Sequence, residues 1–416
     1  MMNYLSTTKK NTDYLTVFLI SSLFTGTCSA QLLASELLED DVLVFDSDTL
    51  QTVDSGSWWD RKPAALKLSA EQLMSQAPGN VDALRTRAGL EYEDAFYPGW
   101  FFRLDTRYTY YWRTDREAER NRGDYGELQT NDLWVQYSQN DCNLKVGRQT
   151  LVWGEVEGTF AVDIVSPFDY TELLLTDFNE VRLAQDMLVG ACFFGQVQTQ
   201  IFFTPEALTD VYRHRSKTYD EKVGSEWGGR LKWLWTGGDI TFSYARLYSN
   251  QPILVLPSYE SSLSRFHFLG LSSSIAIRRL LFKLDIGYKT DQKIPFTARE
   301  ADTLDIAAGV EYTTATNHNF NIGVWTNEYI DDDADLTPEH YVTFGWNKLY
   351  LNDDLTMSAL VNWSKAPKAY GGTLLSQYKW DDYISTDLAL SWSDYKDGRQ
   401  NTNPEKAITL KVKVVF

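Results

Sequence analysis

The chain ends in Ile408-Thr409-Leu410-Lys411-Val412-Lys413-Val414-Val415-Phe416, and this stretch decides the fold class. Every second residue is apolar: Ile408, Leu410, Val412, Val414 and Phe416. The intervening positions begin with Thr409, Lys411 and Lys413. Because successive side chains of a strand point to opposite faces, the segment predicts a strand with one apolar face and one cationic face.

A terminal strand with an aromatic last residue resembles the closing strand of bacterial outer-membrane β-barrels. In those proteins the assembly machinery binds this end, so the resemblance implies that Phe416 contacts that machinery. The alternative is the last strand of a soluble β-sandwich, which would show the same alternation. The rest of the chain decides between the two.

The N-terminus has the three parts of a secretory signal peptide. Lys9 and Lys10 precede a largely apolar run over 15–24, which is too short to span a bilayer, and small residues follow at 28–30. We expect residues 1–30 to be removed. Residues 31–63 are rich in Asp and Glu, which predicts an acidic periplasmic leader, with a short barrel plug as the alternative. The barrel is expected over 64–416.

The composition favours a membrane barrel. The 416 residues include 14 Trp, 24 Tyr and 21 Phe, yet the mean hydropathy is only −0.35. An exported, aromatic-rich chain without a long apolar run fits a barrel, because strand alternation hides its hydrophobicity. The net charge of −18 argues against nucleic acid as a partner.

Alternating segments of roughly ten residues recur from residue 64 onward, as a membrane barrel requires. Charged residues in the middle of a strand are costly when they face lipid and easily accommodated when they face a wet interior. The alternation therefore assigns a set of charges to the barrel interior: Arg85, Arg87, Arg103, Asp105, Arg107, Lys283, Asp285, Lys411 and Lys413.

The connections between these segments alternate between short and long. Short ones are predicted at 139–142, 236–239, 277–280, 352–354 and 380–383. Long ones are predicted at 113–126, 154–186, 205–228, 250–264, 291–301, 331–339, 365–371 and 396–405. Outer-membrane barrels have short periplasmic turns, long outer loops and an even strand number. We therefore predict an all-β antiparallel transmembrane barrel of ~18 strands, with ~16 as the alternative.

One stretch carries a resemblance to a known family. Gly147-Arg148-Gln149 precedes Trp153-Gly154-Glu155, and Asp163, Pro167 and Asp169 follow with the spacing D-x-x-x-P-x-D. The combination resembles a family of proteobacterial outer-membrane barrels of unknown function. Gly147-Arg148-Gln149 alone is similar to a strand of alginate-export and anion-selective porins. The resemblance implies a porin-like barrel.

Arg148 has the parity of Leu144 and Val146, so an unbroken strand would direct it toward lipid. Because that is costly, we predict a bulge at Gly147 that turns Arg148 inward. The loop 155–186 is long and apolar, and such loops are usually functional. We expect it to fold inward and to narrow the pore with charged residues: Arg148, Glu155, Asp163, Asp169, Glu172 and Arg182. The alternative is an ion pair between Arg148 and Glu155 or Asp163 that only holds the loop.

The remaining signals are weaker. Cys142 and Cys192 lie near the same ends of two successive strands in an oxidising compartment, so a disulfide between them is one hypothesis and two free thiols the other. The Asp331–Asp335 run lacks the Gly and Glu of a calcium loop and is expected to be a solvated loop. The four histidines, His214, His267, His318 and His340, lack metal-ligand spacing. We expect no cofactor, no metal and no enzymatic activity.

The sequence thus predicts an outer-membrane channel that passes a polar or amphipathic solute, with a lean toward anions. The alternative is an outer-membrane component of a multi-protein system that transports or exports lipid or polysaccharide, with the acidic leader as its docking arm for periplasmic partners. A third reading is a structural barrel with a blocked interior. Outer-membrane lipid and lipopolysaccharide are expected partners of the outer face in every case.

Overall fold

The structure is a computed structural model, and it describes residues 66–77, 80–114, 125–170, 181–212, 223–251, 253–255, 260–294, 299–330, 338–366, 368–395 and 406–416. The predicted signal peptide, the acidic leader, Glu172, His214 and the Asp331–Asp335 run lie outside these residues. No helix in the described part of the chain is long and apolar enough to cross a membrane.

Eighteen strands form one antiparallel sheet that closes on itself. Its strands are β1 (Leu66–Ala77), β2 (Asn80–Tyr97), β3 (Trp100–Thr114), β4 (Tyr125–Gln139), β5 (Cys142–Gln149), β7 (Gln185–Phe194), β8 (Val197–Thr204), β10 (Glu226–Trp235), β11 (Gly238–Tyr248), β14 (Arg265–Ile277), β15 (Leu280–Lys293), β16 (Glu300–Thr313), β17 (His318–Ile330), β18 (Glu339–Tyr350), β19 (Leu355–Ala366), β20 (Ala369–Lys379), β21 (Ile384–Tyr395) and β22 (Lys406–Val415). Each strand pairs with its neighbours in the sequence, so the prediction of 18 strands is confirmed and the alternative of 16 is wrong.

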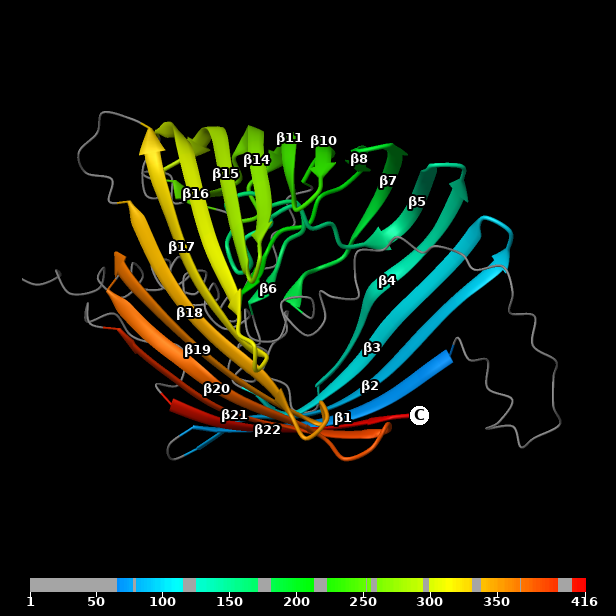
Figure 1. Ribbon diagram of the computed structural model, residues 1–416, viewed down its shortest axis with the longest axis vertical. Coiled ribbons are helices and arrows are strands. Elements are labelled where there is room, and N and C mark those ends of the chain that lie inside the picture. Colours follow the sequence, from blue (N-terminus) through cyan, green and yellow to red (C-terminus); the bar gives the residue numbers. More distant parts are fainter. Residues whose placement is uncertain are drawn as a thin grey trace, which may run out of the picture.

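The barrel closes where the last strand meets the first. β22 runs antiparallel to β1, from Ile408 opposite Gln76 to Val415 opposite Ser69. Figure 1 shows the two strands side by side, red against blue. Beyond the strand, the backbone N–H of Phe416 donates to the carbonyl of Leu68 at 2.7 Å. β1 is therefore a full member of the sheet, paired with β2 on one side and β22 on the other.

Two small sheets supplement the barrel. β6 (Asp169–Tyr170) runs parallel to β9 (Val211–Tyr212), and β12 (Ile253–Val255) pairs with β13 (Glu260–Ser262). Both belong to the connections at the end of the barrel where the long loops lie.

The two faces of the wall follow the predicted alternation. In β22, the apolar residues Ile408 and Leu410 are exposed on the outer face, whereas Ala407, Thr409 and Lys411 are buried on the inner face. Cross-strand partners share a face, so the register carries this assignment around the barrel. The outer face is apolar, and the inner face holds most of the charges.

One predicted loop is a turn. The stretch 365–371 was expected to be a long connection, but β19 ends at Ala366 and β20 begins at Ala369. Gly371 and Gly372 pair with Asn362 and Val361 as strand residues. The glycine at 372 has a packing reason: a Cβ there would lie 2.3 Å from Cζ2 of Trp392, so only glycine leaves room for the indole ring.

Candidate functional site

The connection between β5 and β7 folds against the inner face of the barrel. We call residues 150–184 the inward loop, of which the structure describes 150–170 and 181–184. Its described part is largely buried, including Trp153, Val162 and Val165 at about 1% exposed each. The prediction that this loop folds inward is confirmed.

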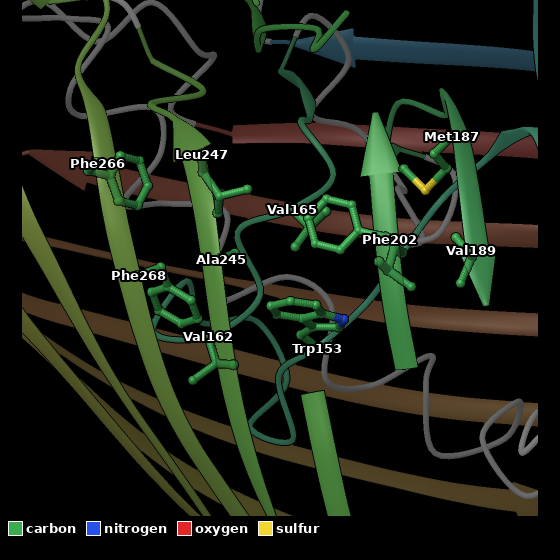
Figure 2. Packing of buried hydrophobic residues seen from close by; sticks show 11 residues of the cluster. Trp153, Val162, Val165, Met187, Val189, Phe202, Ala245, Leu247, Phe266 and Phe268 are labelled. Atoms are coloured by element: carbon green, nitrogen blue, oxygen red, sulfur yellow. The ribbon is translucent and has the colours of Figure 1, made fainter. Parts of the chain in front are cut away.

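An apolar cluster fixes the loop to one side of the barrel. Leu151, Trp153, Val162 and Val165 of the loop pack against inward side chains of four strands: Met187 and Val189 of β7, Phe202 of β8, Ala245 and Leu247 of β11, and Phe266 and Phe268 of β14. Figure 2 shows the loop residues between these strands, with Trp153 beside Phe202. A second cluster joins Val156 and Ala161 to Ala307 of β16 and Trp325 of β17. The loop therefore covers the wall from β7 to β17.

Asp285 of β15 is the main polar anchor of the loop. Its carboxylate accepts the backbone N–H of Glu155 at 2.9 Å and that of Val156 at 2.8 Å. Asp285 is fully buried, with 0% of its surface exposed. The sequence placed Asp285 in the barrel interior, which is correct, but it gave no sign that the residue binds the loop.

Two lysines of the wall bind carboxylates of the loop. Lys232 of β10 contacts Glu155 at 3.0 Å, and Lys283 of β15 contacts Glu157 at 3.2 Å. Each lysine also pairs with a carboxylate of the wall: Lys232 with Asp239 at 3.5 Å and Lys283 with Glu311 at 2.8 Å. The alternation of the strands predicted the inward direction of Lys283, whereas Lys232 and Glu157 were missed.

The loop and the wall approach each other closely at Gly287 of β15. A Cβ at this position would lie 1.9 Å from the carbonyl oxygen of Ala161. Any side chain at 287 would therefore displace the loop. Glycine is required here because the loop lies against the strand, and not because of the backbone conformation.

The charged residues predicted for the loop make different contacts. Asp163 and Arg182 form a buried ion pair within the loop, and the Arg182 guanidinium lies over the ring of Phe168. Asp169 is half-buried in β6, which pairs with β9. Glu155 binds the wall as described. Among the described residues, Asp163, Arg182 and Glu155 thus make contacts that hold the loop.

Arg148 lies on the outer face, so the predicted bulge at Gly147 is wrong. The register runs without a shift through Gly147 on both sides of β5. Arg148 stands opposite the exposed residues Leu133 and Asp186, and its Nε lies 3.4 Å from the Asp186 carboxylate. Arg148 is the penultimate residue of β5, and its charge is paired with Asp186 on the outer face.

A second charged region covers the inner face of β1 to β4, β21 and β22. Glu71 forms ion pairs with Arg85 and Arg87 at 3.6 and 3.8 Å. Further pairs follow along the wall: Arg103 with Glu93 and Asp132 at 2.8 and 3.0 Å, Arg107 with Asp105 at 3.4 Å, and Lys411 with Asp387 at 2.9 Å. Lys413 shares the inward parity of Lys411 and stands opposite Glu71. The interior charges predicted from alternation therefore lie on the inner face, and most of them form ion pairs there.

The structure joins Cys142 and Cys192 in a disulfide, with Cα atoms 4.1 Å apart. The two residues are direct cross-strand partners of β5 and β7. The bridge thus links the two strands from which the inward loop departs, at the opposite end of the barrel. In the described ranges, no group of three or more His, Cys, Asp or Glu side chains is placed to hold a metal ion.

Comparison with solved structures shows barrels of the same fold. The chain is similar to Acinetobacter baumannii OccAB3, with a TM-score of 0.56 and 10% identity over 84% of this chain and 98% of that one. Pseudomonas aeruginosa OpdK with vanillate gives a TM-score of 0.55 and 9% identity over the same shares. P. aeruginosa OccK3 (OpdO) gives 0.52 and 12% over 84% of this chain and 95% of that one. Another structure of OpdK is described as an outer membrane protein, with a TM-score of 0.54 and 10% identity.

No curated protein sequence matches the chain. One protein family does: its members are described as "Protein of unknown function (DUF1302)", and the match covers residues 100–395. This range includes the inward loop and all strands from β3 to β21. Since the match covers most of the sequence, the chain belongs to the DUF1302 family.

Proposed function

We propose that the protein is a porin-like channel of the outer membrane that passes a polar or amphipathic solute and prefers anions. A closed barrel with an apolar outer face fits a bilayer, and ~18 strands enclose enough space for an aqueous path. The inward loop is the element that narrows this path. It is held by Asp285, Lys232 and Lys283, and the ion pairs of β1 to β4 lie on a part of the wall away from these anchors.

The relative exposure of the interior charges supports the preference for anions. In three interior pairs the cation is more accessible than its carboxylate, whereas at the loop anchors Lys232–Glu155 and Lys283–Glu157 the carboxylate is slightly more exposed. The side chain of Arg107 is 22% exposed and that of Asp105 is 8% exposed. For Lys289 and Asp305 the values are 14% and 1%, and for Lys411 and Asp387 they are 11% and 7%. A solute inside the barrel would meet the cationic ends of these pairs first. The similar OpdK structure contains vanillate, an aromatic carboxylate, which fits a solute of this kind.

Ion selectivity in a planar bilayer tests this function. Under a salt gradient, the wild-type protein should give discrete conductance steps and a reversal potential that indicates anion preference. Arg107→Ala should shift the reversal potential toward cations, because it leaves the Asp105 carboxylate uncompensated. Arg148→Ala is the matched control, since it removes one arginine from the outer face and should change neither quantity. Cation preference of the wild type, or equal shifts in both variants, would contradict the proposal.

A further inference from the structure

The outer face carries a cluster of cations and aromatic rings at the long-loop end of three neighbouring strands. We call this cluster the rim patch, and it consists of Trp227 of β10, Tyr244, Arg246 and Tyr248 of β11, and Arg265 and His267 of β14. The three strands are adjacent in the sheet (Figure 1). Trp227, Tyr244 and His267 are exposed on the outer face, and their cross-strand partners share it.

The register brings the basic side chains together. Arg246 stands directly opposite His267, and Arg265 stands opposite Tyr248, two residues nearer the loop end. The Arg265 guanidinium lies 5.1 Å from the centre of the Tyr248 ring, which holds it against the wall. The Tyr244 hydroxyl lies 2.8 Å from Nδ1 of His267, so Nε2 is the ring nitrogen left to bind another group.

Within the described residues, the outward positions of β10, β11 and β14 include no Asp or Glu. Glu226 and Asp239 are buried on the inner face, where Glu226 interacts electrostatically with Arg265, and the outward carboxylate Asp302 lies two strands away on β16 and accepts the Tyr288 hydroxyl. Glu226 accepts the backbone N–H of Tyr248 at 2.7 Å. By contrast, Arg148 on the outer face is paired with Asp186.

Apolar side chains lie directly below the rim patch. Phe242 is two residues from Tyr244 along β11, and Leu269 is two residues from His267 along β14; they are 55% and 53% exposed on the outer face. The surface therefore presents cations next to the rim and an apolar strip beneath them. This order matches an amphiphile with an anionic headgroup and acyl chains, oriented as in a membrane leaflet.

We propose that the rim patch binds a phosphate group of lipopolysaccharide in the outer leaflet. Arg246 and Arg265 donate to the phosphate oxygens, His267 adds a donor through Nε2, and an acyl chain follows Phe242 and Leu269. Guanidinium groups suit this contact because they donate several hydrogen bonds in a fixed plane. The proposal rests on the outer-membrane location of the proposed function, with the long loops outside, but not on channel activity.

Direct contact between arginine and phosphate has a consequence that distinguishes it from cation-bridged binding. Carboxylates bind lipopolysaccharide phosphate only through a divalent ion, whereas arginine needs none. Binding at the rim patch should therefore persist in EDTA.

Native mass spectrometry of the full-length purified barrel with added lipid A tests the proposal. In EDTA, wild-type protein should bind bisphosphorylated lipid A, and the Arg246→Gln/Arg265→Gln variant should bind it at least about tenfold more weakly, the loss expected for one charged hydrogen bond. Arg148→Gln is the matched control and should bind within about twofold of wild type. Phosphatidylglycerol, a phosphate lipid without the saccharide, should compete weakly.

Each other outcome overturns the proposal. Equal affinity of the double variant and wild type would exclude the rim patch, and equal loss in Arg148→Gln would indicate a general charge effect. Equal binding of phosphatidylglycerol would replace lipopolysaccharide with phospholipid. If the double variant does not fold, wild-type protein must still prefer bisphosphorylated over dephosphorylated lipid A by about tenfold, and equal affinity for the two would reject phosphate recognition. Conductance measured on the same samples separates this result from the channel proposal, because the rim patch lies outside the pore.

Discussion

The carboxylate of Asp285 accepts the backbone N–H of Val156 at 2.8 Å, although 129 residues separate them in the chain. It also accepts the N–H of Glu155. One buried side chain of β15 thus holds this part of the inward loop against the inner face of the barrel. We therefore expect loss of this contact to loosen the inward loop.

Replacing Asp285 with Ala should loosen the inward loop without unfolding the barrel. Two N–H donors lose their acceptor, and each loss is expected to cost about 1–3 kcal/mol. In lipid vesicles, limited proteolysis should then cleave the loop faster than in wild type.

Asp305→Ala is the control for this experiment. Asp305 is an equally buried inward carboxylate on the adjacent strand β16, and it binds Lys289 at 2.8 Å and Asn327 at 2.7 Å instead of the loop. Its removal should leave the cleavage rate of the loop near the wild-type rate. Similar rates in the two variants would argue against Asp285 as the specific anchor.

A side chain at position 287 should also displace the loop, because it would push the loop away from the wall. A Cβ there would lie 1.9 Å from the carbonyl oxygen of Ala161, so Gly287→Val should increase proteolysis of the loop as Asp285→Ala does. Gly309→Ala is the control, because a Cβ at 309 would meet Cγ1 of Val156 at 3.5 Å, an ordinary contact. A Gly287→Val loop as resistant as that of wild type would show that the loop and the wall are further apart than described.

The Cys142–Cys192 disulfide should be detectable by thiol labelling. In the denatured mature protein, both thiols should react only after a reductant is added, and Cys142→Ser should expose the Cys192 thiol without reductant. Loss of the bridge should lower the stability of the barrel by about 2–4 kcal/mol. Labelling of the wild-type protein that is independent of reductant would exclude the bridge.

Deleting Phe416 should reduce assembly of the barrel in cells. The deletion removes the terminal aromatic residue and the pairing of its backbone with Leu68 at 2.7 Å. We expect less folded barrel in the outer membrane, measured by heat-dependent migration in gels, while protein refolded in lipid keeps its conductance. Phe416→Tyr keeps the aromatic end and should assemble normally. Normal assembly of the deletion would contradict a role for Phe416 in recognition.

Much of the fold could be predicted because barrel strands have a simple period. The alternation of Leu410 and Lys411, repeated along the chain, indicates both the strand and its two environments. Turn spacing and the even-number rule then give 18 strands. The same alternation places Arg103, Asp105, Lys283 and Asp285 on the inner face.

The site was harder to predict because it depends on contacts between distant segments. Nothing near Asp285 in the sequence indicates that it accepts the N–H groups of Glu155 and Val156. The cost of a mid-membrane charge predicts Arg148 in the interior, but the residue lies on the outer face, where its charge is paired with Asp186 and the strand has no bulge. Alternation alone does not show the height of a residue along its strand or the partner that faces it.

Single-channel conductance of wild type, Asp285→Ala and Asp305→Ala in planar bilayers tests the central claim most directly. Both variants remove one inward carboxylate, so they change the interior charge equally and differ in whether the loop loses its anchor. We predict discrete steps for wild type, larger and noisier steps for Asp285→Ala, and near wild-type steps for Asp305→Ala. A folded wild-type barrel that does not conduct, or equal conductance in the two variants, would contradict a channel narrowed by the inward loop.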